Sequence, residues 1–323
     1  MKIKCPACGY ENYFTGLELE DESAIFCCNC NSKKPLVEPK ISDATESSDY
    51  DSLDPHKENI EAYKQVIRIN PDDAVTYISL GLAYGKLGLY KEAIEAYKQV
   101  IRIDPNNADA YYNLGNTYNT LNLYEEAIDA YKQVIRIKPN NADAYYNLGN
   151  TYNSLGLYKE AIEAYKQAIR INPDDAVAYY NLGLVYVSLS LHKAAIEAYK
   201  QAIHIHPNYA DAYISLGSTY GSLGLYEEAI EACKQAIRID PNYAVEAYNN
   251  LGLAYNGLGL YEEAIEACKQ AIRIDPDQAI PHLNLGSTYL LIGDKKSALN
   301  EYNILKELDS NFANNLSDKL WPK

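Results

Sequence analysis

The residues best suited to chemistry in this sequence are four cysteines near its start. Cys5 and Cys8 form one C-x2-C pair, and after eighteen further residues Cys27 and Cys30 form a second one. Two such pairs fit the four-thiolate pattern that holds a tetrahedral Zn²⁺, because each pair supplies two ligands from one turn. The sequence therefore predicts a structural zinc site in which all four ligand positions are filled and none is open for catalysis.

Alternatives stay open for these cysteines. Cys28 could replace Cys27 as a ligand, which would give a tighter C-x-C pair. A redox dithiol or an iron–sulfur cluster also uses closely spaced thiols, although no helix or α/β pattern surrounds these pairs. The segment resembles a zinc ribbon, with short strands expected near residues 12–19 and 23–27. Because about thirty residues cannot bury enough apolar surface to fold alone, the metal would supply the stability.

The composition limits the classes of partner that the chain as a whole can bind. Of its 323 residues, 29 are Lys or Arg and 44 are Asp or Glu, which gives a net charge of −15. This charge would repel phosphate at long range, so we do not expect the whole chain to coat nucleic acid or to bind an anionic membrane. No stretch is apolar over the ~18 residues that a membrane helix needs, and the start shows no secretory signal pattern, so we expect a cytoplasmic protein.

Prolines mark a tandem repeat through most of the sequence. Their spacing is 34 residues five times and then 35, in the series Pro71, Pro105, Pro139, Pro173, Pro207, Pro241 and Pro276. Within a unit, apolar residues recur at steps of three and four, as in 74–87 and 91–103, which predicts two amphipathic helices per unit. Gly88 stands where the end of a helix favours a left-handed residue, and Asn107 can cap the next helix.

A 34-residue unit with Leu-Gly-x-x-Tyr, then Ala-x-x-x-Tyr, then Pro resembles the tetratricopeptide repeat. The resemblance implies an all-α fold, a right-handed α-solenoid of helix–turn–helix repeats, here preceded by the small β zinc ribbon. We expect a zinc-ribbon-like module at 1–34, an acidic flexible linker at 35–56, an N-terminal half repeat at 57–70, seven repeats within 71–312, and a C-terminal capping helix and tail at 313–323.

The repeat template also predicts the roles of individual residue types. Most of the 32 tyrosines should pack between helices as framework. Cys233 and Cys268 stand where other copies have tyrosine, so we expect small buried apolar residues and not reactive thiols. The sixth copy carries one extra residue near Val245, so its first helix must bulge or begin late.

In the tetratricopeptide family the first helices line a concave groove that binds extended peptides or partner helices, and here that face carries asparagines. Helical spacing stacks the sixth, ninth and twelfth residues of each copy on one side. The candidate groove residues are Asn113, Asn116, Asn147, Asn150, Asn181, Asn250 and Asn284, with Tyr112, Tyr146 and Tyr180 beside them. Because an amide both donates and accepts hydrogen bonds, this Asn ladder could hold a partner by its main chain. The alternative is that these asparagines are hydrated framework residues.

The charges of the groove indicate which partner it favours. Its fifth, sixth, ninth and twelfth positions hold no Lys or Arg, so it lacks the basic clamp with which some family members hold acidic C-terminal tails. The second position carries Asp109, Asp143 and Asp211 or an apolar residue. An extended, neutral or basic segment of a protein partner is therefore favoured electrostatically.

Together these patterns predict a non-enzymatic protein–protein interaction scaffold or adaptor that binds a partner segment in the groove. The alternative is a nucleic-acid-associated or transcription-related adaptor that contacts nucleic acid through the zinc ribbon, where Lys2, Lys4, Lys33 and Lys34 lie in sequence close to the cysteine pairs. The sequence has no Gly-rich phosphate loop, nucleophile–base set or open metal site, so we expect no enzyme and no small-molecule substrate. We expect no membrane partner either.

Overall fold

The computed structural model describes four stretches of the chain, namely residues 2–4, 11–13, 55–241 and 244–320. The chain divides between Leu53 and Asp54 into two units. Most of the predicted zinc module and nearly all of the predicted acidic linker lie outside the described residues. The predicted ligands Cys5, Cys8, Cys27 and Cys30 are among the residues outside them.

The described part of the first unit is a pair of short strands. β1 (Lys2–Lys4) runs antiparallel to β2 (Glu11–Tyr13), with Lys4 opposite Glu11. β2 overlaps the strand predicted near 12–19, whereas β1 was not predicted. The strand predicted near 23–27 lies outside the described residues.

Sixteen helices make up the described part of the second unit, and no strand lies within 55–241 or 244–320. They are α1 (Pro55–Ile69), α2 (Ala74–Lys86), α3 (Tyr90–Ile103), α4 (Ala108–Thr120), α5 (Tyr124–Ile137), α6 (Ala142–Ser154), α7 (Tyr158–Ile171), α8 (Ala176–Ser188), α9 (His192–Ile205), α10 (Ala210–Ser222), α11 (Tyr226–Ile239), α12 (Val245–Gly257), α13 (Tyr261–Ile274), α14 (Ala279–Leu291), α15 (Lys295–Leu308) and α16 (Ser310–Leu320).

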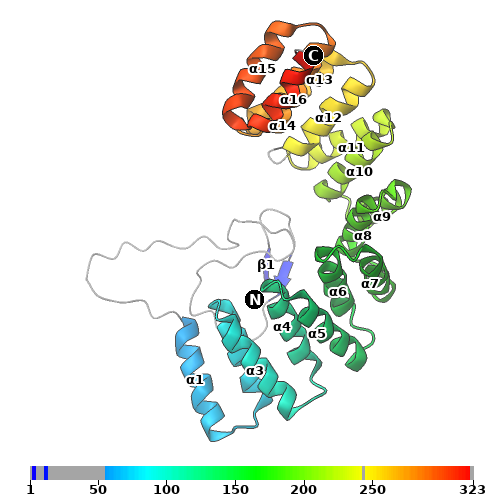
Figure 1. The fold of residues 1–323 in the computed structure, drawn as a ribbon. Coiled ribbons are helices and arrows are strands. Elements are labelled where there is room, and N and C mark those ends of the chain that lie inside the picture. Colours follow the sequence, from blue (N-terminus) through cyan, green and yellow to red (C-terminus); the bar gives the residue numbers. More distant parts are fainter. Residues whose placement is uncertain (1, 5–10, 14–54, 242–243, 321–323) are drawn as a thin grey trace, which may run out of the picture. The chain divides into compact units, whose positions relative to one another are not determined.

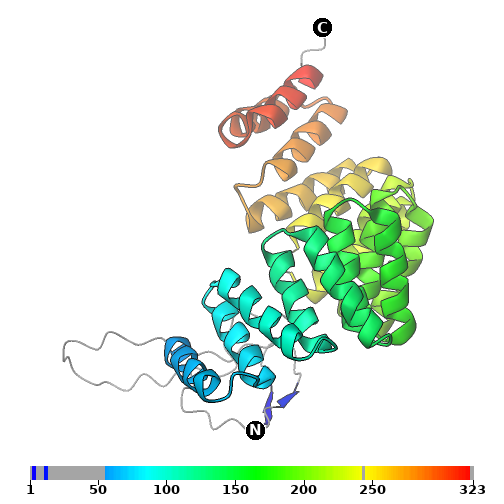
Figure 2. The same ribbon diagram turned by 60° about the horizontal axis from the view of Figure 1, so that its bottom comes forward.

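The helices from α2 to α15 form seven helix–turn–helix repeats. The first helix of each repeat, here called the A helix, packs along the second, or B helix, and each B helix packs on the A helix of the next repeat (Figures 1 and 2). The predicted all-α solenoid is thereby confirmed. The sixth copy departs from the others as expected, because α12 begins one residue late at Val245.

Local caps explain where the A helices begin and end. The Asn107 side chain accepts a hydrogen bond from the Ala110 N–H at 3.0 Å, which satisfies a donor that the helix leaves free. Gly88 follows α2 with a φ of 72°, in the left-handed region that glycine adopts without a Cβ clash. In the second and fourth copies the same position is held by Asn122 and Ser190, both with φ 58°.

A tyrosine on the B helix packs against a glycine on the A helix of the same repeat. A Cβ placed on Gly115 would lie 2.7 Å from the ring of Tyr131, so the two helices approach as closely as they do only because this residue is glycine. Cys233 and Cys268 replace this tyrosine in two copies and are fully buried, and burial raises the pKa of each thiol to about 12. Both are therefore small apolar packing residues, as predicted.

The last helix closes the C-terminal end of the array. In α16, Ala313 and Leu316 are buried against α14 and α15, whereas Asn314 and Asn315 are exposed. A helix with one apolar side and one polar side suits the end of a repeat array. The structure has a helix at 310–320, which overlaps the segment 313–323 for which the sequence predicts a capping helix and tail.

Ser190 gives a direct test of this account of the turns. The change Ser190→Gly should raise the free energy of unfolding by about 1 kcal/mol, because a side chain in the left-handed region costs energy that glycine does not. Chemical denaturation of the full-length protein measures the difference. The reverse change at the same position of the third copy, Gly156→Ala, should lower the free energy of unfolding by a similar amount. Shifts in the same direction for both variants would contradict the backbone explanation.

Candidate functional site

The A helices of the second to fourth copies carry the first part of the predicted Asn ladder. Asn113 and Asn116 lie on α4, Asn147 and Asn150 on α6, and Asn181 on α8, and all five are half-buried. Because α4 contacts α6 and α6 contacts α8, the structure brings these side chains into one row. The surface that they form is called the A face below.

Asn116 joins two repeats through hydrogen bonds. Its Oδ1 accepts one from the Tyr131 hydroxyl at 2.7 Å and another from Asn147 Nδ2 at 3.2 Å. Asn147 Nδ2 also donates to the Tyr112 hydroxyl at 3.0 Å. Tyr131 belongs to the same repeat as Asn116, whereas Asn147 belongs to the next one. The network therefore links the helices within a repeat and also links successive repeats.

The same contacts recur, in part, further along the A face. Asn150 Oδ1 accepts a hydrogen bond from the Tyr165 hydroxyl at 2.6 Å. Asn181 Nδ2 donates to the Tyr146 hydroxyl at 2.8 Å. A second group of ladder residues lies nearer the C-terminus, where Asn284 Nδ2 donates to Asn249 Oδ1. Five of the seven predicted ladder asparagines, together with Tyr112 and Tyr146, thus have a role in the framework.

The remaining amide groups are free to meet a partner. Among the described residues, the side chains of Asn113 and Asn250 make no hydrogen bond, and neither does Asn147 Oδ1. The framework alternative posed by the sequence therefore holds for part of the ladder, and partner binding by the remaining groups stays a prediction. The framework uses one part of the amides, and a set of donors and acceptors is left over on the A face.

Burial keeps the tyrosines of this network protonated. It raises the pKa of Tyr131 and of Tyr165, because an ionised phenol would lose its hydration. The pKa of Tyr112 is raised by burial first and then by the negative charge of Asp143. Near neutral pH the hydroxyls of Tyr131 and Tyr165 therefore stay protonated and can donate to Asn116 and Asn150.

The acidic rim of the A face is uneven. The carboxylate of Asp109 is paired with Lys138 Nζ at 2.9 Å, a contact between two exposed side chains that the sequence did not reveal. In the fifth copy, burial raises the pKa of Asp211, and the charges of Glu246 and Asp240 raise it further. Negative charge thus gathers between the fifth and sixth copies. At the second copy, by contrast, the charge of Asp109 is neutralised by Lys138.

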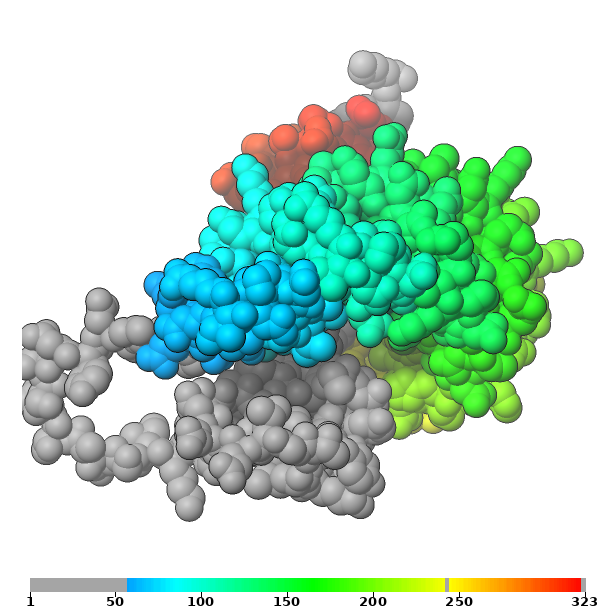
Figure 3. Space-filling model, turned by 90° about the horizontal axis from the view of Figure 1, so that it is seen from below, coloured from blue at the N-terminus to red at the C-terminus, as the bar shows by residue number. Residues whose placement is uncertain are grey.

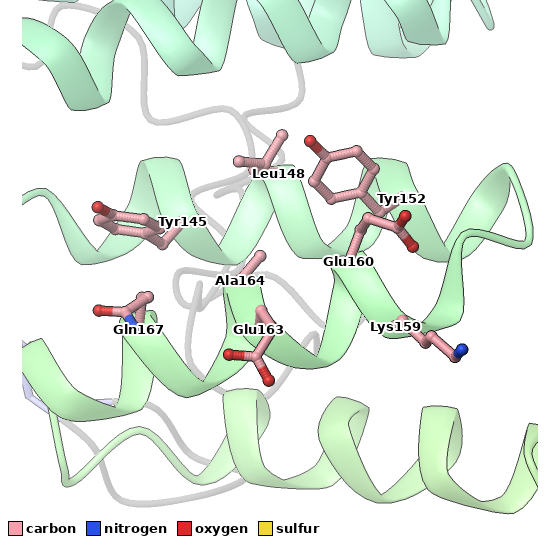
Figure 4. Close-up of a pocket in the computed structure, with 8 residues that line it drawn as sticks. All are labelled: Tyr145, Leu148, Tyr152, Lys159, Glu160, Glu163, Ala164 and Gln167. Atoms are coloured by element: carbon pink, nitrogen blue, oxygen red, sulfur yellow. The ribbon is translucent and has the colours of Figure 1, made fainter.

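Pockets of similar size occur in two of the repeats. In the third copy a pocket of about 410 Å³ lies between α6 and α7 and is lined by Tyr145, Leu148, Tyr152, Lys159, Glu160, Glu163, Ala164 and Gln167 (Figure 4). The first copy has a pocket of about 410 Å³ lined by the residues at the same positions, Tyr77, Leu80, Tyr84, Lys91, Glu92, Glu95, Ala96 and Gln99. Because the lining recurs with the repeat, it is a property of the repeat and not a dedicated ligand site.

His282 and Glu301 form a buried pair in the seventh copy that the sequence analysis missed. His282 Nδ1 lies 2.7 Å from Glu301 Oε2, and Nε2 lies 3.2 Å from the Pro276 carbonyl. The hydrogen bond to Glu301 raises the pKa of His282, although burial opposes the shift. In the third copy the same positions are Tyr145 and Ala164, which line the pocket. The sequence signal that could have revealed the pair is that the seventh copy alone replaces both residues, with His282 in place of tyrosine and Glu301 in place of alanine.

The described part of the chain shows neither a metal-binding cluster nor a membrane-spanning helix. That part contains no group of three or more His, Cys, Asp or Glu residues placed to hold a metal ion. The predicted zinc ligands Cys5, Cys8, Cys27 and Cys30 lie outside it. None of its helices has the length and apolar character that crossing a bilayer requires.

Comparison with protein families identifies the repeats. A family model described as TPR repeat matches residues 56–88, 86–122, 115–156 and 149–190. A model described as Tetratricopeptide repeat matches residues 176–209, 210–243 and 245–278. Together the two models span more than half of the chain. A search of curated proteins found no match.

Solved structures show the same kind of array. The crystal structure of the MamA protein is 38% identical, covers 53% of this chain and 93% of its own, and has a TM-score of 0.50. The crystal structure of YrrB, described as a TPR protein with an unusual peptide-binding site, is 26% identical, covers 62% of this chain and 99% of its own, and has a TM-score of 0.51. A tetratricopeptide repeat protein from Parabacteroides merdae is 18% identical, covers 80% of this chain and 99% of its own, has a TM-score of 0.57, and shows the fold alone.

The division of the Asn ladder predicts different costs for two alanine substitutions. Asn116→Ala should lower the free energy of unfolding by about 1–3 kcal/mol, because the Tyr131 hydroxyl and an Asn147 N–H lose their acceptor. Asn113→Ala should change it by less than about 0.5 kcal/mol, because no hydrogen bond of that side chain is lost. Denaturant titration of both full-length variants provides the measurement. Equal costs for the two variants would show that the network is not what stabilises the array.

Proposed function

Because the chain belongs to the tetratricopeptide repeat family, we propose that its array holds an extended segment of a protein partner against the A face. Arrays of this family are protein-interaction scaffolds. The observation that carries the proposal is the set of amide groups left over on the A face, namely the Asn113 side chain on α4 and Asn147 Oδ1 on α6. A donor and an acceptor on neighbouring helices match the C=O and N–H groups of a peptide backbone.

The framework contacts favour this use of the amides. Asn116 Oδ1 is held by two hydrogen bonds, and Asn147 Nδ2 donates two. These bonds orient the opposite ends of both amides before any partner arrives. A side chain that is already ordered loses little conformational entropy on binding, so more of the interaction energy appears as affinity. The peptide-binding site in the description of YrrB is a property of that protein and supports the proposal by analogy.

The partner segment is proposed to be neutral or basic. The groove positions hold no Lys or Arg, and the charges of Asp143, Asp211 and Glu246 lie at or near the A face. An acidic segment would meet like charge there, whereas a basic one would be attracted. The proposed activity is binding alone, without catalysis.

We also propose that the first unit binds one structural Zn²⁺ through Cys5, Cys8, Cys27 and Cys30. The donor set fits the ion, since four thiolates are a preferred tetrahedral zinc environment. The pairing of β1 with β2 supports this, because the stretch of sequence between the two paired strands contains Cys5 and Cys8. A contact of this unit with nucleic acid is the alternative function, and it is tested below with nuclease.

Capture of partners from native lysate tests the groove. Three full-length baits are compared, and the first is the unmodified chain. The second, the groove variant, carries Asn113→Arg and Asn250→Arg, which block the A face without breaking a framework hydrogen bond. Asn315→Arg on the exposed side of α16 is the matched control. The unmodified chain and the control should capture similar amounts of partner protein. The groove variant should capture at least about tenfold less, because each added arginine repels a basic segment. Identical capture by all three proteins would contradict the proposal.

Nuclease treatment in the same experiment separates the two functions. If partners are held by the A face, they stay bound after treatment, because no nucleic acid connects them to the chain. Partners that leave only after treatment would favour the alternative, in which the first unit contacts nucleic acid.

Metal analysis of purified full-length protein tests the zinc site. We expect about one Zn per chain, and Cys27→Ser should remove most of it because three thiolates hold the ion far less tightly. Cys28→Ser is the matched control and should leave the zinc content unchanged. Loss of zinc in Cys28→Ser but not in Cys27→Ser would reverse the ligand assignment. Iron in place of zinc, or no metal at all, would contradict the proposal.

A further inference from the structure

Two positions of the A helices change from apolar to polar and back again along the first four copies, which follow one another from the blue end of the array to green in Figure 3. The second residue of these copies is in turn Val75, Asp109, Asp143 and Val177, and the ninth is in turn Leu82, Asn116, Asn150 and Leu184. The two middle copies are the ones in which both the sixth and the ninth residue belong to the Asn ladder. Of the seven copies, only the first and the fourth are apolar at both positions.

The four apolar side chains at these positions are exposed. On α2, Val75 is 73% and Leu82 45% exposed, and on α8, Val177 is 45% and Leu184 36% exposed. They are called the apolar pairs below. At about 100° per residue, the second, sixth and ninth residues lie within about 60° of one another around a helix, so each apolar pair lies in line with the ladder. The framework does not require apolar residues here, because aspartate and asparagine hold the same positions of α4 and α6.

Contacts between successive A helices place one apolar pair at each end of the ladder. The helix α2 contacts α4, α4 contacts α6, and α6 contacts α8. Since helices in contact lie about 8–10 Å apart, the three steps from α2 to α8 span roughly 24–30 Å. An extended chain advances about 3.3 Å per residue, so about seven to nine residues cover this span.

We propose that the partner segment carries two large apolar side chains about eight residues apart, which pack on the apolar pairs of α2 and α8 while the main chain between them meets the Asn ladder. The inference rests on the proposed function, because it specifies the segment that the A face holds. The amides of the ladder can bind a main chain whatever its sequence, whereas the exposed valines and leucines are stabilised only by apolar side chains that cover them. The two ends therefore determine which segment binds.

The charges of the same face favour a basic residue between the two apolar side chains. Asp143 is exposed on α6 and makes no ion pair with any described residue. Lys86, by contrast, follows Leu82 by four residues at the end of α2. A cation of the segment is therefore attracted by the middle of the ladder and repelled from its α2 end.

The sixth copy has half of an apolar pair and provides a matched control. Leu253 at its ninth position is 46% exposed, but the second position of this copy is Glu246. The fifth copy, which separates it from α8, has Asp211 and Ser218 at the two positions. A segment that spans α2 to α8 does not reach Leu253, although this leucine is as exposed as Leu82.

Selection from a library of random peptides displayed on phage tests the spacing, with the full-length protein as bait. Peptides of about 16 residues are long enough to span α2 to α8. The enriched peptides should carry two large apolar residues about seven to nine residues apart, with Lys or Arg more frequent than Asp or Glu between them. A different spacing, a single apolar residue or an acidic middle would overturn the proposal.

Substitutions in the array test the apolar pairs themselves. Leu82→Asn and Leu184→Asn introduce the residue that the second and third copies have at this position, so the variants fold. Each should weaken the binding of an enriched peptide, made synthetically and labelled for fluorescence anisotropy, by about tenfold, because a leucine contact is lost. Leu253→Asn is the matched control and should leave the affinity unchanged. Equal weakening by all three substitutions, or by none of them, would overturn the proposal.

Asn113→Arg separates this inference from the proposed function. A peptide that no longer binds Asn113→Arg, but binds Leu82→Asn and Leu184→Asn like the unmodified chain, would overturn the apolar pairs and leave the proposed function standing. A library from which no peptide is enriched would contradict both, because the A face would then hold no extended segment.

Discussion

The close packing of a B-helix tyrosine on an A-helix glycine, which occurs in each of the first four repeats, determines much of the rest of the array. At Gly115 and Gly149 a single added carbon would lie within 2.7 and 2.8 Å of the ring of Tyr131 and of Tyr165, respectively. The contact brings the two helices of a repeat together and directs the tyrosine hydroxyl toward the A face. There it meets the asparagine next to the glycine, Asn116 in one copy and Asn150 in the other.

One consequence is that the proposed recognition of a partner would use side chains that also stabilise the array. An amide has two ends, and in Asn116 the oxygen accepts two framework hydrogen bonds. In Asn147 the nitrogen serves the framework and the oxygen is left over. A repeat protein can therefore keep asparagine at these positions for folding and still present hydrogen-bonding groups to a partner. Substituting every ladder residue at once would confound the two roles, whereas Asn113 and Asn250 separate them.

The regular part of this fold could be predicted from the sequence because its causes are local. Asn107 caps its helix and Gly88 adopts a left-handed conformation through interactions within a few residues, and both were read from the repeat pattern. The extra residue near Val245 also acts locally, because it moves the start of α12 by one residue. The periodic apolar residues were enough to place the helix pairs.

The contacts between repeats could not be predicted in this way. The bonds among Asn116, Tyr131 and Asn147 depend on the distance and rotation of three helices, which no spacing along the chain specifies. Pairing His282 with Glu301 required knowing that these two positions face each other across a repeat.

The most direct test of this account is a double-mutant cycle between Tyr131→Phe and Asn116→Ala, measured by chemical denaturation and analysed with a nearest-neighbour model for repeat arrays. The account predicts a coupling free energy of about 1 kcal/mol, because each substitution removes the same hydrogen bond. Effects that simply add would contradict it, since the tyrosine and the A-face asparagine would then stabilise the array independently.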